Sequence, residues 1–231
     1  MKEYRHYIHQ VGTIKTLLEG HHESEVTIAE LLRYGDYGFG TLNHTDGDFV
    51  IIDGQPVHMN QYGEHHGLNG QEKVPYGAVV QFRPQHDFVV KQVEHVDIFQ
   101  HIKERLINTQ LFSMTKLTGD FNYIHLSVYS KNHSPHTLKR PFHIPQTERA
   151  VRQIKGTILI LYTPHDFTGI HPPGFSAYFV SEYHELVGKV LSFKVSNADA
   201  QLQNLDGYTM ICPAAEPLFI SCLLYTSPSP R

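Results

Sequence analysis

The stretch PPGFSAYFVSEYHELVGKVLSF reads as two strands joined by a polar turn. Its first arm contains Ser176 and Tyr178, and its second arm contains Lys189. Side chains two residues apart in a strand share a face, so Ser176 and Tyr178 are expected to lie side by side. The same alternation in the second arm places Lys189 on one side together with Leu191 and Phe193. The simplest interpretation is a half-buried hairpin, because most alternating segments form only sheet.

Histidine is unusually frequent, with 18 residues in a chain of 231. Most histidines stand in polar stretches, such as the pairs at positions 21–22 and 65–66. Neighbours in a loop rarely present converging lone pairs, so we expect solvated loop residues there rather than metal ligands. The two cysteines, Cys212 and Cys222, have neither the pattern of a disulfide framework nor that of a zinc site. This usage is typical of a protein in a reducing cytoplasm.

The composition is that of an ordinary globular protein, with 40% hydrophobic and 18% charged residues. The formal net charge of -4 argues against nucleic acid or an anionic membrane surface as a partner. No apolar run reaches the roughly 18 residues that a transmembrane helix needs. The first ten residues lack the apolar core of a secretion signal. We therefore expect a cytoplasmic protein.

Hydrophobic periodicity and turn residues predict helices and strands in alternating groups. The helices are expected at Gly12–Gly20, Val26–Tyr34 and Asp97–Asn108. The strands, besides the two arms of the hairpin, are expected at Gly38–Asn43, Phe49–Ile52, Gln55–Asn60, Ala78–Phe82, Phe88–Gln92, Ser113–Leu117, Phe121–Val128, Thr157–Tyr162 and Gln201–Leu205. Two runs of helix followed by several strands favour an α+β fold with an internal duplication.

Local signals refine this outline. Thr27 and Glu30 have the spacing of a capping box, and Gly35 is placed to end that helix in a left-handed conformation. Gly119 indicates a turn between two strands. The stretch Tyr129–Lys155 contains three prolines and many polar residues, which indicates a long excursion such as a linker or lid.

The chain divides into three parts on this basis. Residues 1–130 are expected to form an N-terminal helix-plus-sheet half, and residues 131–220 a C-terminal sheet half that carries the hairpin. The last part, residues 221–231 with the sequence SCLLYTSPSPR, resembles translated adaptor or vector sequence. We exclude it from the fold, and Cys222 then carries no meaning.

Several segments resemble the alpha-acetolactate decarboxylase family. VTIAELLRYGDYGFGTLNHTDGDFVIIDGQPVH is similar to the family's helix followed by G-D-x-G-x-G-T-x-N, D-G-E and a D-G turn, and EKVPYGAVVQF to another recurring segment. The hairpin resembles the family's metal-binding hairpin, G-F-H-x-H-F followed by G-G-H-V-L-D-F. The segments recur in the same order over roughly residues 10–215. The resemblance implies duplicated β-rich halves with mixed or antiparallel sheets and a few helices, a site in the cleft between the halves, and a homodimer.

The resemblance also implies a reaction, the decarboxylation of 2-acetolactate to acetoin on the route to acetoin and butanediol. In the family, a zinc ion held by three histidines chelates the hydroxyl and the ketone of this keto acid. Loss of CO2 leaves an enediolate, whose negative charge the metal stabilises as a Lewis acid. An arginine binds the substrate, and glutamates transfer the proton that sets the configuration of acetoin.

The family's three zinc positions fall on Ser176, Tyr178 and Lys189 in this chain. A protonated Lys189 would repel a dication by on the order of several kcal/mol at about 4 Å and an intermediate dielectric. We therefore expect no zinc, and no other cofactor, at this site.

The family's other site residues are also replaced. The arginine falls on Ser127, the first glutamate on Asp48, and the second glutamate near Glu216. His125 lies two residues from Ser127 and would share its face, so it could form half of a rebuilt site with Asp48. The alternative is that His125 packs or forms hydrogen bonds within the cleft.

These replacements leave three functions open. The first is a family enzyme, a carboxy-lyase, whose activity is lost or altered. The second is a non-catalytic binding or partner protein on the same fold. The third is a metal-free decarboxylase in which Lys189 forms a Schiff base with the ketone and so supplies another electron sink. A related fold occurs in small DNA-associated domains, but the acidic balance argues against that function.

Overall fold

Six five-residue strands form the first sheet of the computed structural model, which describes residues 6–45, 47–60, 62, 67–129 and 146–212. They are β1 (Tyr7–Val11), β2 (Tyr37–Thr41), β3 (Asp48–Ile52), β4 (Gln55–Met59), β5 (Tyr76–Val80) and β11 (Gly207–Ile211). Their order is β11-β1-β5-β2-β3-β4. β1 and β11 pair in parallel and the other neighbours are antiparallel, so the sheet is mixed.

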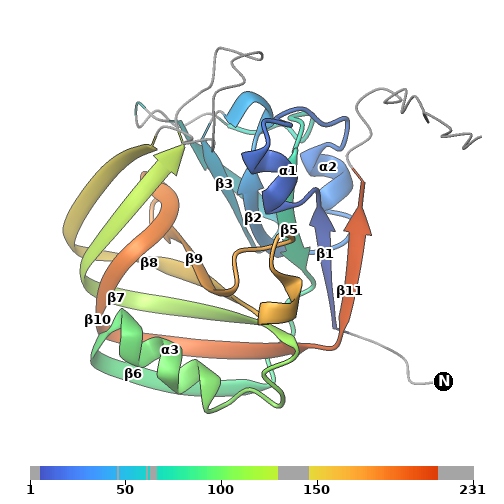
Figure 1. Ribbon diagram of the computed structural model, residues 1–231. Coiled ribbons are helices and arrows are strands. Elements are labelled where there is room, and N and C mark those ends of the chain that lie inside the picture. The colour runs from blue at the N-terminus through green and yellow to red at the C-terminus, as the bar shows by residue number, and fades with distance from the viewer. Residues whose placement is uncertain (1–5, 46, 61, 63–66, 130–145, 213–231) are drawn as a thin grey trace, which may run out of the picture.

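The second sheet is antiparallel and strongly curved (Figure 1). Its strands are β6 (His86–Glu94), β7 (Phe112–Tyr129), β8 (Gln146–Thr163), β9 (Gly174–Ser181) and β10 (Val187–Leu205), in the order β6-β10-β7-β8-β9. β9 also pairs with β10, so the sheet closes on itself at that end. Register shifts along β10, together with positive φ angles at Gln92 and Gln153, mark bulges that bend the long strands.

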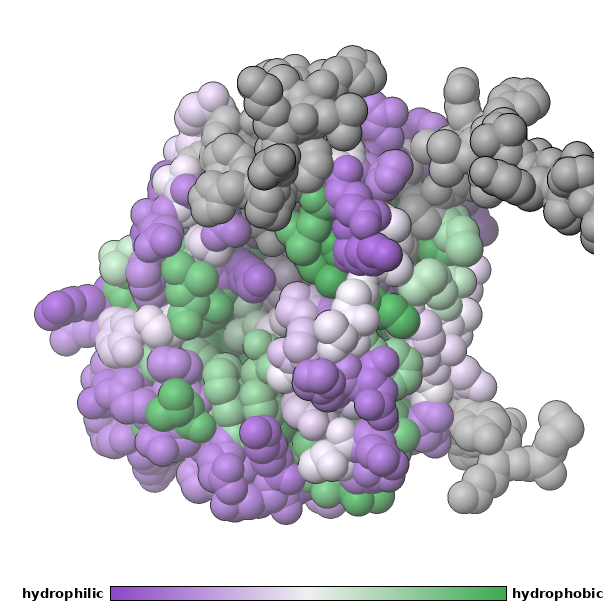
Figure 2. Space-filling model, in the orientation of Figure 1, coloured by the Kyte–Doolittle hydropathy of each residue, from purple (hydrophilic) through white to green (hydrophobic). Residues whose placement is uncertain are grey.

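Short helices complete the described structure. They are α1 (Ile14–Leu18), α2 (Ile28–Leu31), α3 (His95–Lys103) and the 3-10 turns η1 (Asn43–Thr45) and η2 (His165–Phe167). α3 packs on the inner face of the curved sheet, where Phe99 stacks on Phe175 with ring centroids 4.4 Å apart. Figure 2 shows this side of the molecule as hollowed near its centre, with hydrophobic residues in the hollow and hydrophilic residues around it. None of the helices within the described ranges has the length and apolar character of a membrane span.

The two sheets share one hydrophobic core. It joins first-sheet residues such as Phe39 and Val50 to second-sheet residues such as Phe121, Leu159 and Phe179, all fully buried. A mostly β structure with few helices and one mixed and one antiparallel sheet confirms the predicted fold class. The strand orders of the sheets differ, and an internal duplication stays a prediction.

The boundary between the sheets does not coincide with residue 130. β6 and β7 precede that residue and belong to the second sheet, whereas β11 returns to the first sheet at the end of the described chain. Neither β1 nor β11 was among the expected strands. The tail at 221–231 lies outside the described residues.

Two glycines have a different role from the one predicted. Gly35 has no positive φ, and a Cβ there would lie 2.6 Å from the Val80 carbonyl oxygen, so it permits close backbone approach and does not adopt a left-handed cap. Gly119 forms no turn, because β7 continues through it, and a Cβ there would meet the Asn197 carbonyl oxygen at 2.2 Å. Both glycines therefore allow neighbouring backbone segments to approach closely, because they carry no Cβ atom.

The long excursion predicted for Tyr129–Lys155 is partly wrong, because β8 begins at Gln146 and pairs with β7 along its whole length. Residues 130–145 lie outside the described ranges. The Thr27–Glu30 capping box is confirmed, with the Glu30 backbone N–H donating to the Thr27 hydroxyl at 3.2 Å. The three helices are shorter than expected, and α2 and α3 are followed by turns with bonds between residues three apart, such as Arg33 N–H to Glu30 O.

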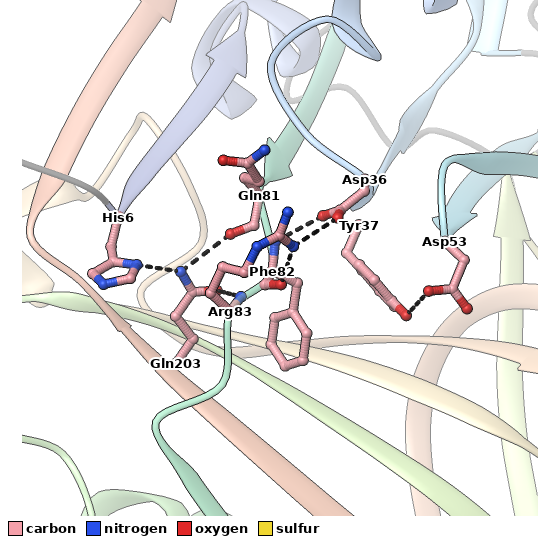
Figure 3. Close-up of polar contacts among 8 residues, drawn as sticks. All are labelled: His6, Asp36, Tyr37, Asp53, Gln81, Phe82, Arg83 and Gln203. Atoms are coloured by element: carbon pink, nitrogen blue, oxygen red, sulfur yellow. Dashed lines mark hydrogen bonds and ion pairs between the residues drawn. The ribbon is translucent and has the colours of Figure 1, made fainter.

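A buried amide joins the two sheets (Figure 3). The side chain of Gln203, in β10, accepts a hydrogen bond from the Arg83 backbone N–H at 2.9 Å and donates to the Gln81 carbonyl at 3.2 Å. It also bonds to the His6 ring at 2.9 Å. Arg83 pairs in turn with Asp36 at 3.0 Å. Because Gln203 is fully buried, these bonds fix β10 against the segment that links β5 and β6.

Replacing this amide should lower stability. We expect Gln203→Leu to reduce the free energy of unfolding by about 1–3 kcal/mol, because it leaves buried backbone groups without partners. Urea denaturation followed by circular dichroism measures the change. Gln201→Leu, two residues earlier in the same strand, is the matched control, because the Gln201 side chain is partly exposed and bonds to Asp87 at the surface, and it should change stability by less than about 0.5 kcal/mol. Equal losses in the two variants would contradict a special role for Gln203.

Candidate functional site

Three of the residues at family site positions lie in one row across the second sheet. Lys189 in β10 pairs directly with Ser127 in β7 on one side and with Tyr178 in β9 on the other. Directly opposed residues on neighbouring strands point to the same face. Ser176 lies two residues before Tyr178 and shares that face. The structure therefore brings together the four residues that the resemblance assigns to the family's zinc and arginine positions.

A bulge corrects the prediction for the second arm of the hairpin. The register between β10 and β7 shifts between Val190 and Ser192, which leaves Leu191 as an extra residue. Leu191 is 41% exposed, whereas Phe193 is buried on the inner face. Lys189, Leu191 and Phe193 therefore do not lie on one side, because the bulge breaks the alternation.

The first sheet presents a second polar row. Thr41 in β2 pairs with Asp48 in β3 and with Tyr76 in β5. The Thr41 hydroxyl donates a hydrogen bond to Asp48 Oδ1 at 3.0 Å, and both side chains are buried. Phe39 lies two residues before Thr41 and shares its face. This row therefore belongs to the face that packs on the second sheet.

Two contacts connect the rows. The rings of Phe39 and Tyr178 stack with centroids 4.0 Å apart and planes 15° apart. The Tyr76 hydroxyl and His171 Nδ1 are 2.6 Å apart, in a buried hydrogen bond between the first sheet and the segment before β9. We call the polar residues gathered here the intersheet cluster: Thr41, Asp48, Tyr76, Ser127, His171, Ser176, Tyr178 and Lys189.

His171 is the most deeply buried titratable residue of the cluster. Its side chain has no exposed surface, and burial, followed by the positive charge of Lys189, lowers its pKa to about 3. The imidazole is therefore neutral at physiological pH. Its Nε2 atom is buried and has no hydrogen-bond partner in the described structure. Such an atom costs about 1–3 kcal/mol.

Lys189 is the cation of the cluster. Its side chain is partly buried, and no described residue forms an ion pair with it. No ion pair joins Lys189 to Asp48, and Asp48 accepts a hydrogen bond from Thr41. The cluster thus combines the Lys189 ammonium with hydroxyls, a neutral imidazole and the Asp48 carboxyl group, which accepts a hydrogen bond from Thr41.

Two predicted site residues remain, His125 and Glu216. His125 Nε2 lies 3.0 Å from Glu148 Oε2, so the His125 side chain has a partner other than Asp48. Glu216 lies outside the described residues. A hollow of about 300 Å³ lies between β4 and the turn that joins β9 to β10, and is lined by Pro56, Val57, His58, Gly67, Tyr183, His184 and Glu185. It is a space between the two sheets, but Lys189 does not line it.

Sequence reasoning missed three residues of the cluster. Thr41 ends the G-D-x-G-x-G-T segment, and Tyr76 lies in EKVPYG, so both were inside recognised segments without being singled out. His171 immediately precedes two prolines and the hairpin. Their position within or beside the recognised segments was the signal that could have identified them as site residues. The residue type of a single histidine or tyrosine does not indicate a functional role.

The donor set of the cluster does not fit a zinc ion. The resemblance places Ser176, Tyr178 and Lys189 at the ligand positions, and they offer two neutral hydroxyls and an ammonium. The ring of Tyr178 is also held by its stack on Phe39. Within the described ranges, no three histidine, cysteine, aspartate or glutamate side chains gather in a group that could hold a metal ion.

Comparison with known proteins decides the family. The model of the alpha-acetolactate decarboxylase family matches residues 8–224. The chain belongs to this family. An alpha-acetolactate decarboxylase of Lactococcus lactis subsp. cremoris is 31% identical over 214 residues, which cover 91% of this chain and 89% of that protein. The relative from Brevibacillus brevis is 25% identical and covers 90% of this chain and 74% of that protein.

Solved structures agree with the family in fold. A Staphylococcus aureus protein of unknown function, described as similar to alpha-acetolactate decarboxylase, superposes with a TM-score of 0.83 and 30% identity. The superposition covers 90% of this chain and 89% of the Staphylococcus aureus chain. The alpha-acetolactate decarboxylase of Bacillus subtilis strain 168 gives a TM-score of 0.82 at 21% identity, with the same coverage. The predicted family resemblance is confirmed.

Restoring the family's ligands should restore metal binding. We expect purified protein to contain no stoichiometric zinc, whereas the triple variant Ser176→His, Tyr178→His and Lys189→His should bind it, because the three positions share one face. Elemental analysis after dialysis measures zinc per chain. The double variant that retains Lys189 is the control and should bind poorly. One zinc per wild-type chain, lost in Lys189→Ala, would refute this prediction.

Burial of His171 also predicts a pH dependence. A histidine with a depressed folded pKa stays neutral while the unfolded chain binds a proton below about 6.5, so stability falls as pH drops from 6.5 toward 3. From pH 6 to 5, this one group should remove about 1 kcal/mol from the free energy of unfolding. Urea denaturation at both pH values should show that the free energy of unfolding of His171→Gln falls by about 1 kcal/mol less than that of the wild-type protein between pH 6 and pH 5. His165→Gln, on the exposed surface, is the control for loss of one histidine.

Proposed function

We propose that the intersheet cluster binds a small 2-hydroxy or 2-keto carboxylic acid through the Lys189 ammonium, and that the family's decarboxylation of 2-acetolactate is lost or strongly reduced. The single observation that carries this proposal is the position of Lys189. It occupies the centre of the row between Ser127 and Tyr178, partly buried and without an ion pair to a described residue. The protein is then a binding member of an enzyme family.

Electrostatics favour an anionic ligand at this position. An ammonium in a partly buried site lacks some of the hydration that it has in water, and a carboxylate replaces it through a charge-assisted hydrogen bond. The hydroxyls of Ser127, Ser176 and Tyr178 surround it with further donors. Polar groups of this kind fix the orientation of a small ligand.

The same residues do not support the family's chemistry. Decarboxylation leaves an electron pair on carbon, and the resemblance assigns its stabilisation to a dication that chelates two oxygens. An ammonium carries half of that charge and cannot chelate. Ser127 replaces the arginine, so a bidentate grip on the carboxylate is also lost. Binding survives these changes more readily than catalysis, which needs interactions that strengthen in the transition state.

A second candidate is a Schiff-base decarboxylase, which the lack of an ion pair at Lys189 favours. Its neutral amine would add to the ligand's ketone and lose water to form an iminium. Loss of CO2 would then move the electron pair of the broken bond onto the iminium nitrogen as an enamine, and protonation and hydrolysis would release acetoin and the lysine. This route needs a deprotonated Lys189, whereas carboxylate binding needs the protonated form.

An activity assay and a binding titration separate these functions. We expect no acetoin from racemic 2-acetolactate, with or without chelator, and binding of the stable analogue 2-hydroxy-2-methylbutanoate by calorimetry. Lys189→Met keeps the length of the side chain and removes the charge, so affinity should fall at least about tenfold. Lys194→Met, which removes a lysine that pairs with Glu94 on the surface, is the matched control.

Three results would contradict the proposal. Acetoin formation that chelator abolishes would mean that a metal enzyme survives. Substrate trapped on Lys189 by borohydride would instead support the covalent route. Failure of the analogue to bind wild-type protein would end the proposal of carboxylate binding.

A further inference from the structure

His171 has one ring nitrogen that nothing in the described structure satisfies. Nδ1 lies 2.6 Å from the Tyr76 hydroxyl, whereas Nε2 is fully buried and has no partner. Buried polar atoms in native proteins are nearly always hydrogen-bonded to protein, water or ligand. The buried Nε2 atom of His171 therefore indicates a missing partner.

The bond to Tyr76 leaves two tautomers for the imidazole. If the Tyr76 hydroxyl donates to Nδ1, then Nε2 carries the proton and is a donor. If Nδ1 donates to the hydroxyl, then Nε2 is an acceptor. In either form the ring is neutral, and Nε2 can bond to a ligand hydroxyl, while a ketone oxygen requires the donor form.

His171 lies beside the cation of the cluster. Its ring meets Phe39 edge-on with centroids 6.2 Å apart, and Phe39 stacks on Tyr178, which pairs directly with Lys189. The charge of Lys189 also contributes to the electrostatic environment of the imidazole. These contacts connect the imidazole of His171 to Lys189 across the two sheets.

We propose that His171 is a specificity-determining residue, whose Nε2 binds the oxygen on the carbon next to the carboxyl-bearing centre of the ligand while Lys189 binds its carboxylate. This inference rests on the proposed binding function. Nε2 is covered in the free protein, so binding is accompanied by a local side-chain rearrangement, which is common at binding sites. The ligand class is a carboxylic acid with oxygens on two successive carbons.

Two stable analogues test this assignment. 2,3-Dihydroxy-2-methylbutanoate carries the second oxygen, and 2-hydroxy-2-methylbutanoate lacks it. Calorimetry should show that wild-type protein prefers the first analogue and that His171→Phe loses about tenfold in affinity for that analogue alone. Lys189→Met should weaken both analogues by similar factors. His171→Asn is a second variant that retains a polar side chain if His171→Phe does not fold.

A spectroscopic readout on wild-type protein needs no variant. With 15N-labelled histidine, the Nε2 resonance of His171 should shift on saturation with the dihydroxy analogue and should not shift with the monohydroxy one. An unchanged Nε2 resonance, or equal losses for both analogues in His171→Phe, would overturn the role of His171 while leaving carboxylate binding intact. Failure of the monohydroxy analogue to bind wild-type protein would overturn the proposed function itself, and this inference with it.

Discussion

Strand β10 is the constraint on which the rest of the structure depends. It pairs with β6, β7 and β9, and then leads through a single residue into β11, which pairs with β1 in the other sheet. A strand shared among so many partners has little freedom of register, because a shift by one residue would turn each side chain to the opposite face. The buried amide of Gln203 adds a fixed point between the sheets.

This register decides the chemistry of the site. The pairing of Lys189 with both Ser127 and Tyr178 belongs to the ladder that closes the second sheet, so the ammonium cannot leave the row without opening the ladder. The bulge at Leu191 then returns Phe193 to the inner core. The same strand therefore presents a cation to the first sheet and an apolar side chain to the core.

Local patterns predicted the parts of the fold that depend on local interactions. The hairpin and the capping box at Thr27 follow from alternation and side-chain spacing, and both are present. β1 and β11 were missed because Tyr7 pairs with Gly207, and no local pattern reports a contact across 200 residues (207 minus 7). Gly119 suggested a turn because glycine is permissive in turns and in close strand contacts alike.

The residues of the site also divide into those that the sequence predicted and those that it did not. The family resemblance located Ser127, Ser176, Tyr178 and Lys189, and the sheet register brings them together. Tyr76 and His171 were not predicted, because their importance lies in a hydrogen bond between segments 95 residues apart. A buried neutral histidine is a property of its surroundings, and residue type alone does not reveal it.

The positive charge of Lys189 and the neutral state of the His171 imidazole are physically linked. If His171 were protonated beside Lys189, two positive charges would share a buried region at high cost, so burial and the lysine together keep the ring neutral. A neutral ring can donate or accept one hydrogen bond without competing for the carboxylate. The cluster then attracts an anion through one group and recognises its shape through another. Lys189 supplies the charge that attracts the ligand, and His171 supplies the selectivity. A chelating dication would supply both at once.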